Sequence, residues 1–344
     1  MENRNIAIDI AKGIGIILVV WGHVIQVSAG EGNFDYWGNS IFEIIYSFHM
    51  PLFIFLSGFT ASYSLNKRSH TITIKNRFTT LMIPFLSWGF IMYFIKFIGN
   101  VILNERLDST LLEFMIATML NPGLGLWFFW VLFFLYLIII LAKKLENKIG
   151  IVSYILIYIL LLTIPINDVF YIFMIKWLYP FFIIGYLINS RVIKIPTKKH
   201  SLNLIILIVF SIFIQNFGYY DYIYNSKMSL TSASMLGNIL DYSYRYIIAF
   251  LGIFLVIASV DYIKNRKIIN FLMGIGKYSF DIYSLQPTLN ILLGFVPFIL
   301  TNSVLFNAGY APGLTLVIIM LSILVSKLIS CIPETPNYDL TKTS

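Results

Sequence analysis

The sequence has little charge and almost no cysteine. Charged residues make up 12% of its 344 residues, whereas 58% are hydrophobic and 17% are aromatic, and the mean hydropathy is +0.83. Because soluble domains carry about 25% charged residues, this shortage excludes a soluble enzyme, a nucleic-acid-binding domain, a disordered chain and a disulfide scaffold. The single cysteine, Cys331, excludes an intrachain disulfide and a cysteine-based zinc site. We therefore expect an all-α polytopic membrane protein with no metal and no permanently bound cofactor.

Long apolar runs define the expected spans. A transmembrane helix needs about 20 mostly apolar residues, and ten segments of the chain qualify. They are residues 6–28, 40–65, 78–103, 124–142, 149–166, 169–188, 201–217, 240–260, 275–300 and 312–332. The ninth contains Pro287 and Pro297. Since no connecting loop is long enough for a folded soluble domain, residues 1–344 are expected to form a single transmembrane domain.

The positive charges are distributed unevenly among the loops. The net charge is +8, and with a cytosolic N-terminus the inner segments hold 18 Lys and Arg residues, against two, Arg106 and Lys227, in the outer loops. Positive charge stays on the cytosolic side during insertion. The asymmetry therefore predicts a multi-pass protein of the plasma or inner membrane with both termini in the cytosol. It also explains the basic composition without nucleic acid as a partner.

Several ionisable residues fall inside the expected spans, where charge is costly and usually faces a cavity or a partner. They are the cations Lys12, Lys96, Lys176 and Arg245, the anions Asp9, Glu43, Asp241 and Asp281, and the histidines His23 and His49. Snorkelling or pairing between helices is the simpler explanation for Lys96, Lys176 and Arg245. Arg245 follows Asp241 by four residues, which is one helical turn.

The first span carries its polar residues on one face. Asp9 and Lys12 are three residues apart, and His23 follows Lys12 by eleven. Eleven residues of α-helix return to within about 20° of the starting direction and rise about 16 Å. One stripe of the helix should thus hold a charge pair near the cytosol and an imidazole near the outer boundary. The alternative is an interfacial histidine without a function.

The second span is interrupted at mid-depth by His49-Met50-Pro51. A proline inside a helix removes a backbone hydrogen bond and usually kinks it. Ser57 lies further inward and favours a packing role. Glu43 lies near the outer end, at about the depth expected for His23, so its carboxylate is a candidate for orienting that imidazole.

Five motifs, in order along the chain, carry a resemblance to a known family. The first joins residues 9–13 (DIAKG) to residues 19–23 (VVWGH), and the second is residues 48–59 (FHMPLFIFLSGF). The weaker three are residues 77–84, residues 126–129 (LWFF) and residues 276–283 (GKYSFDIY). They resemble motifs of the integral-membrane acyltransferase-3 family, in particular its fucose 4-O-acetylase-like branch. In that family a basic residue precedes an essential histidine by eleven positions, as Lys12 precedes His23.

The chain departs from the family pattern at three places. The basic residue is usually Arg, and Lys12 keeps the charge but cannot bind a phosphate in the bidentate way of a guanidinium. A second Arg is common three residues after the position of Arg77, where this chain has Thr80. Gln286 stands where the family often has a histidine, and an amide cannot act as a base.

The resemblance implies an acyl-CoA-dependent O-acyltransferase that acylates a hydroxyl of a cell-surface or exported carbohydrate at the lipid bilayer. The acyl group is acetyl by default, with succinyl as the alternative, and acetyl-CoA is a co-substrate. We predict His23 as the general base or as a transient acyl carrier, and Lys12, Asp9 and Glu43 as the other residues of the catalytic group. The predicted donor-binding cations are Lys12, Lys75 and Arg77. The candidate acceptor or channel residues are His49, Ser57, Trp127, Arg245, Asp281 and Gln286.

Two other functions are compatible with buried charges in a helical membrane protein. A transporter or flippase for a lipid-linked glycan would also use proline-broken spans. A scaffold of a polysaccharide synthase would tolerate replacement of His23. A transporter or flippase does not explain why the Lys12–His23 stripe and the His49-Met50-Pro51 stretch occur together. The acceptor sugar, the position acylated and the oligomeric state stay open.

Overall fold

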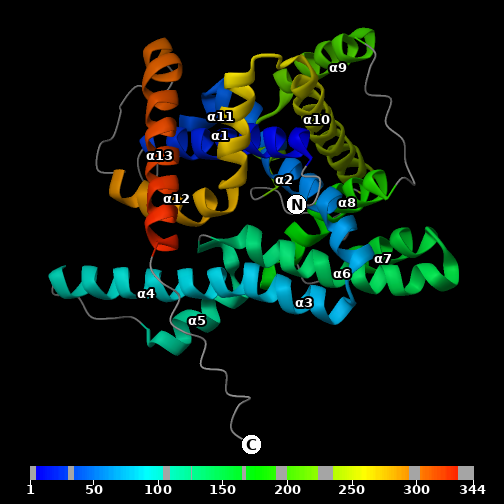
Figure 1. The fold of residues 1–344 in the computed structure, drawn as a ribbon, viewed down its shortest axis with the longest axis horizontal. Helices are drawn as coiled ribbons and strands as arrows, with labels where there is room; N and C mark the ends of the chain where they lie inside the picture. Colours follow the sequence, from blue (N-terminus) through cyan, green and yellow to red (C-terminus); the bar gives the residue numbers. More distant parts are fainter. Residues whose placement is uncertain are drawn as a thin grey trace, which may run out of the picture.

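A computed structural model shows an all-α architecture (Figure 1). It describes residues 5–29, 35–103, 109–124, 126–164, 168–190, 200–223, 235–293 and 303–331. The α-helices are α1 (Ile6–Ser28), α2 (Ser40–Lys67), α3 (His70–Arg77), α4 (Ile83–Leu103), α5 (Leu111–Leu120), α6 (Trp127–Ile149), α7 (Val152–Thr163), α8 (Ile172–Asn189), α9 (His200–Phe213), α10 (Met235–Tyr262), α11 (Arg266–Lys277), α12 (Ser279–Leu293) and α13 (Ala311–Ser330). Two π-helical turns, Phe78–Met82 and Phe306–Tyr310, lead into α4 and α13.

Asparagine caps set where the first two long helices begin. The Asn5 side chain accepts a hydrogen bond from the Ala7 N–H at the start of α1. The Asn39 Oδ1 atom accepts one from the Ile41 N–H at the start of α2, and the Asn39 Nδ2 atom donates to Asn307 Oδ1 at 2.8 Å. Such caps satisfy backbone donors that have no partner inside the helix. The second cap also joins α2 to the turn before α13.

Seven helical segments of the described chain are long and apolar enough to cross a membrane. They are Ile6–Ser28, Ser40–Lys67, His70–Ile102, Trp127–Ile149, Val169–Asn189, Ile239–Tyr262 and Phe306–Ser330, and each falls on a predicted span. Two shorter apolar helices, Val152–Thr163 and Ser201–Asn216, fall on the fifth and seventh. The protein is thus an all-α polytopic membrane protein, as predicted. The count of ten spans and the cytosolic termini stay predictions.

The expected ninth span, residues 275–300, does not coincide with a single helix. Helix α11 ends at Lys277 and α12 begins at Ser279, so a break at Tyr278 falls inside the expected span. The last part of that span, residues 294–300, lies outside the described residues. A third short apolar helix, α5, occupies an expected outer loop, where Thr110 and Glu113 cap each other's backbone N–H groups.

Helices α1 and α2 lie at the centre of the packing. Helix α1 contacts α2, α10, α11, α12 and α13, while α2 also contacts α6, α8 and α10 (Figure 1). Ile16 and Val20 of α1 and Leu52 and Leu56 of α2 are fully or almost fully buried. The polar residues of the first two spans are therefore enclosed by other helices, which is the environment expected for a site.

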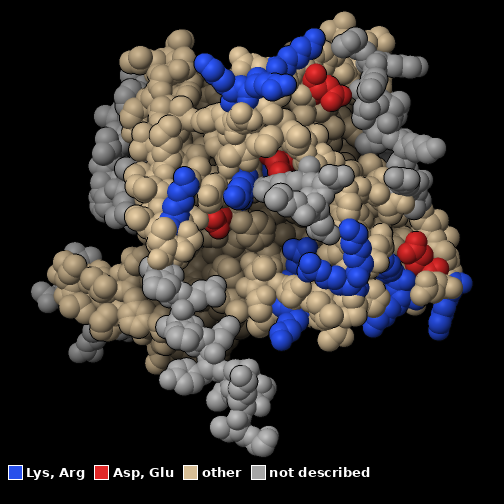
Figure 2. Space-filling view, viewed as in Figure 1, with Lys and Arg blue, Asp and Glu red and all other residues tan. Residues whose placement is uncertain are grey.

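Basic side chains gather on one face of the molecule. Figure 2 shows Lys and Arg over α3 and the part of α6 beside it, and again at the connection between α10 and α11, with a hollow between the two groups. These regions carry the predicted inner loops. The gathering agrees with a cytosolic orientation of this face under the positive-inside tendency.

Glycines allow α2 and α8 to touch through their backbones. A Cβ atom on Gly58 would lie 2.0 Å from the Phe182 carbonyl oxygen, and one on Gly185 would lie 2.1 Å from the Phe55 carbonyl oxygen. Backbone atoms cannot turn aside as a flexible side chain can, so each site needs hydrogen in place of a side chain. The packing role favoured for the Ser57-Gly58 stretch is thus present at Gly58.

Replacing Gly58 with alanine should destabilise the protein by about 1–3 kcal/mol, the usual cost of forcing extra volume into a packed contact. The measurement is thermal unfolding of the purified variant in detergent. Gly274→Ala is the matched control, because a Cβ atom there meets nothing within 4 Å. Equal melting temperatures for the two variants would show that α2 and α8 can separate without cost.

Candidate active site

A cavity of about 630 Å³ lies between α1, α2, α6 and α12, and we name it the Lys12 cavity. It is lined by Lys12, Ile16, Val19, Met50, Phe53, Ser57, Thr60, Arg77, Phe128, Phe129, Leu132, Tyr136, Ser279, Phe280 and Tyr283. Two of the predicted donor-binding cations, Lys12 and Arg77, thus meet in one space although they come from different helices. Most of the remaining lining is apolar.

One face of α1 forms a wall of this cavity. Lys12, Ile16 and Val19 are spaced by four and three residues, so they share a face. His23 continues that face one turn beyond Val19, at a helical rise of about 16 Å from Lys12. It is half-buried and is not among the lining residues of the Lys12 cavity. The stripe predicted from the sequence therefore runs along the cavity and on past it.

Arg77, the last residue of α3, connects the Lys12 cavity to a more polar one. Its guanidinium carbon lies 4.4 Å from the centre of the Tyr136 ring, a cation–π distance. A second cavity, of about 530 Å³ and here named the Arg68 cavity, is lined by Ser64, Arg68, Thr73, Asn76, Arg77, Thr79 and Thr80. Lys75 is exposed and lines neither cavity. Sequence analysis missed Arg68, which belongs to no quoted motif.

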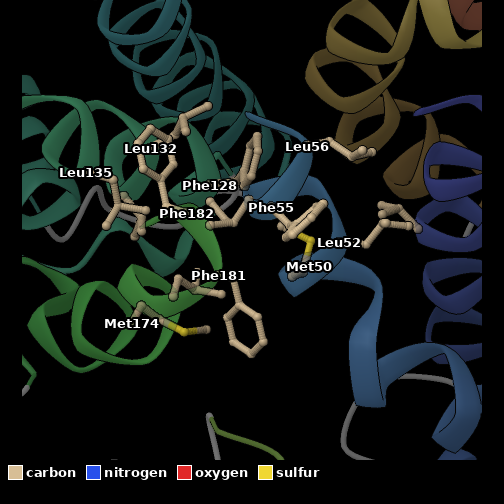
Figure 3. Close-up of a cluster of buried hydrophobic side chains, with 14 of the residues drawn as sticks. Met50, Leu52, Phe55, Leu56, Phe128, Leu132, Leu135, Met174, Phe181 and Phe182 are labelled. Carbon is tan, nitrogen blue, oxygen red and sulfur yellow. The ribbon is translucent and has the colours of Figure 1, made fainter. Parts of the chain in front are cut away.

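A third cavity, of about 400 Å³, lies on the other side of Met50, and we name it the His49 cavity. It is lined by Tyr46, Ser47, His49, Met50, Pro51, Trp127, Met174, Trp177, Leu178, Phe217, Asp221, Tyr222, Ile223 and Arg245. Figure 3 shows Met50 on the side of α2 that faces α6 and α8. The predicted acceptor residues His49, Trp127 and Arg245 are brought together here.

The orientation of the His49 ring is fixed by its own helix. Its Nδ1 atom lies 2.8 Å from the Ile45 carbonyl oxygen, and the side chain is 2% exposed. A carbonyl only accepts, so the neutral ring donates from Nδ1 and keeps an electron pair on Nε2. Within the described residues Nε2 has no hydrogen-bond partner. The His49 ring can therefore accept a hydrogen bond from a ligand.

His23 belongs to a small polar group at the outer part of α1 and α2. Its ring is hydrogen-bonded to the Gln26 side chain, and the Tyr46 hydroxyl donates to Gln26 Oε1 at 3.0 Å. The centre of the Tyr46 ring lies 6.4 Å from that of His23 and 4.6 Å from that of His49. Tyr46 thus lies beside both imidazoles and also lines the His49 cavity.

The two carboxylates predicted for the catalytic group, Glu43 and Asp9, are placed differently from Gln26. Glu43 is half-buried, and within the described residues its carboxylate has no hydrogen bond to His23. Asp9 is 7% exposed and lies where α1 meets α11, since a Cβ atom on Gly276 would approach the Asp9 carbonyl oxygen to 1.9 Å. The place next to the His23 ring belongs to Gln26, one helical turn away on α1.

The polar end of the His49 cavity is formed by α10 and the segment before it. The Arg245 Nη2 atom donates to the Tyr220 carbonyl oxygen at 2.9 Å, and Asp221 is close enough to Arg245 for an electrostatic interaction. Burial raises the pKa of the Asp221 carboxyl, while the Gly218 N–H and Arg245 act to lower it. Asp221 and Tyr222 were missed, because no motif marks them in the sequence.

The remaining predicted acceptor residues do not share one place. Ser57 lines the Lys12 cavity. Asp281 accepts a hydrogen bond from the Ser326 hydroxyl at 2.6 Å, which joins α12 to α13. Gln286 is 1% exposed, and neither it nor Asp281 lines the three cavities described above. Ser279 and Tyr283, from the same late motif, do line the Lys12 cavity.

Comparison with known proteins gives one family. Nodulation protein NolL of Mesorhizobium japonicum is 30% identical over 190 residues, 54% of this chain and 48% of that protein. NolL of Sinorhizobium fredii is 30% identical over 197 residues, 56% of this chain and 50% of that protein. The chain thus spans about half the length of the curated relatives it matches, and no solved structure gives a significant match. The acyltransferase-3 profile, described as "Acyltransferase domain", matches residues 5–331, from the cap of α1 to the end of α13, and the chain therefore belongs to the acyltransferase-3 family.

Proposed function

We propose that this protein is a membrane O-acyltransferase that moves an acyl group, acetyl by default, from acyl-CoA to a hydroxyl of a carbohydrate. The observation that carries the proposal is the Lys12 cavity, where two cations from different helices meet and whose α1 wall continues to His23. Family membership supports acyl transfer as the chemistry. The donor, the acceptor and the residue roles below are parts of the proposal.

The donor enters from the cytosolic side. Acyl-CoA carries its phosphates at one end and its thioester at the end of a long flexible arm. Arg68 and Arg77 hold the phosphates, because guanidinium groups match phosphate oxygens in charge and geometry. Lys12 binds a phosphate oxygen deeper in the cavity. The arm then runs along Ile16 and Val19 toward His23. This direction agrees with the basic face in Figure 2 and with cytosolic termini.

The acceptor sugar occupies the His49 cavity. The rings of Tyr46, Trp127 and Tyr222 offer apolar faces with polar edges, which suits a sugar ring that has both C–H and O–H groups. Asp221 and Arg245 add charged hydrogen-bonding groups at one end. A few placed polar groups in a mainly apolar concave site are the usual design of a small-molecule site.

The proposed acyl transfer needs one proton acceptor, and His23 supplies it. A ring nitrogen of His23 takes the proton of the acceptor hydroxyl while the hydroxyl oxygen attacks the thioester carbonyl carbon. The carbon–sulfur bond then breaks, and the departing CoA thiolate takes the proton back from His23. The products are the carbohydrate ester and CoA. Gln26 and Tyr46 hold the His23 ring, and His49 accepts a hydrogen bond from the acceptor.

The experiment that tests this function uses purified protein in lipid vesicles with labelled acetyl-CoA and surface glycans. We expect acceptor-dependent release of CoA thiol and glycans heavier by one acetyl group in mass spectrometry. A transporter or flippase would consume no acyl-CoA. Failure to release CoA from acetyl-CoA or succinyl-CoA, with surface glycans unchanged in cells lacking the protein, would contradict the proposal.

Replacing Arg77 with alanine should raise the donor KM about tenfold, with a smaller effect on kcat, because a phosphate contact contributes to binding before and during reaction alike. Initial rates at varied acetyl-CoA give both constants. Lys75→Ala is the matched comparison, since it removes an exposed cation two residues away that lines neither cavity. Equal KM shifts for the two variants would mean that Arg77 attracts the donor only through general surface charge.

A further inference from the structure

Met50 lies between the Lys12 cavity and the His49 cavity. Of the described residues that line the Lys12 cavity and the His49 cavity, Met50 is the one shared by both. Its neighbours divide cleanly, because His49 and Pro51 line the His49 cavity and Phe53 lines the Lys12 cavity. The Met50 side chain is 7% exposed. It is therefore a buried partition and not part of the lipid-facing surface.

The start of α6 is divided between the same two cavities. Trp127 lines the His49 cavity, whereas the next residue, Phe128, lines the Lys12 cavity. Figure 3 shows Met50 of α2 with Phe128 and Leu132 of α6 on one side and Met174 and Phe181 of α8 on the other. A methionine side chain is unbranched and has three rotatable bonds, so it can move without disturbing the helix that carries it.

We infer that Met50 sets the size of the acyl group that this protein transfers. This inference rests on the proposed function, in which the donor arm runs through the Lys12 cavity toward His23 and the acceptor sugar occupies the His49 cavity. The acyl carbon leaves sulfur for oxygen where these spaces meet, so the acyl group must fit against Met50. An acetyl group ends at its methyl, whereas each further methylene of a longer chain competes with the Met50 side chain for the same volume.

The test compares kcat/KM for acetyl-CoA and butyryl-CoA in vesicles containing the wild type or the Met50→Ala variant. One methylene in an apolar pocket changes specificity by about 10- to 200-fold. We therefore expect the acetyl-to-butyryl preference to fall at least about tenfold in Met50→Ala, mainly through faster butyryl transfer. Met50→Val should give an intermediate value and serves if the alanine variant does not fold.

Met174→Ala is the matched control for a lost methionine. Met174 is also buried, at 2% exposed, but of these two cavities it lines only the His49 cavity. Its truncation should change transfer from all donors by one common factor and leave the donor preference as it was. An unchanged preference in active Met50→Ala and Met50→Val variants would overturn the role of Met50. Absence of transfer from any acyl-CoA by the wild type would instead overturn the proposed function itself.

Discussion

Replacing His23 with alanine is expected to lower the rate of acyl transfer by about 10²- to 10⁴-fold, the usual contribution of a general base. A sugar hydroxyl is a poor nucleophile at neutral pH, so the loss of the proton acceptor affects the chemical step and lowers kcat with little change in the donor KM. Because the ring contacts Gln26 and the edge of Tyr46 and does not fill the core, the variant should insert and fold.

The rate is measured as CoA release and acetyl transfer in vesicles, with insertion checked by thermal unfolding. His70→Ala is the control for loss of an imidazole, since His70 begins α3 and lines none of the three cavities. Near-normal transfer by a well-folded His23→Ala variant would remove His23 from the mechanism. Incubation with labelled acetyl-CoA without acceptor separates the two roles left open, because only an acyl carrier retains label.

The positions of the long helices were predictable because they depend mainly on one variable, the length of an apolar run. The break inside the expected ninth span was missed for a related reason. Helix α11 is short and amphipathic, and it is held by close contact with α1 at Gly13 and Gly276. A helix that packs on protein needs only one apolar face, so it does not stand out as a long apolar segment.

The part of the site that lies on one helix was also predictable. Helical periodicity places Lys12 and His23 on the same face, and Gln26 follows His23 by three residues, which brings their side chains together. Glu43 was considered from depth alone, and equal depth on two helices does not fix which way a side chain points. The i, i+3 spacing of His23 and Gln26 was the signal in the sequence that could have identified Gln26.

The residues that complete the cavities could not be found in this way. Arg68 follows the end of α2 and lines the same cavity as Arg77, the last residue of α3. Asp221, in the segment before α10, lines the same cavity as Arg245 of α10. Such contacts join residues of different structural elements, which show no helical periodicity in the sequence. The place of Met50 between two cavities likewise depends on three helices at once.

Replacing Lys12 with methionine is expected to raise the donor KM by about 10- to 100-fold. Methionine keeps the length and the apolar stem of the side chain but removes the ammonium group, and a hydrogen bond to a charged group contributes about 1.5–3 kcal/mol. Lys12 is half-buried in the wall of the Lys12 cavity, where screening by water is weaker than at the exposed Lys75. The effect should therefore exceed that of Lys75→Ala.

Lys12→Arg is the variant to compare with Lys12→Met, because it keeps the positive charge and introduces the guanidinium that the family usually has at this position. If Lys12 binds a phosphate of the donor, the donor KM of the Lys12→Arg variant should lie within a few-fold of that of the wild type. Bidentate binding of the phosphate by the guanidinium group can lower this KM further. Titration with CoA alone, which carries the phosphates but no acyl group, should rank wild type, Lys12→Arg and Lys12→Met in the same order. Unchanged CoA affinity in Lys12→Met would place the phosphates elsewhere and leave Lys12 as a structural cation of α1.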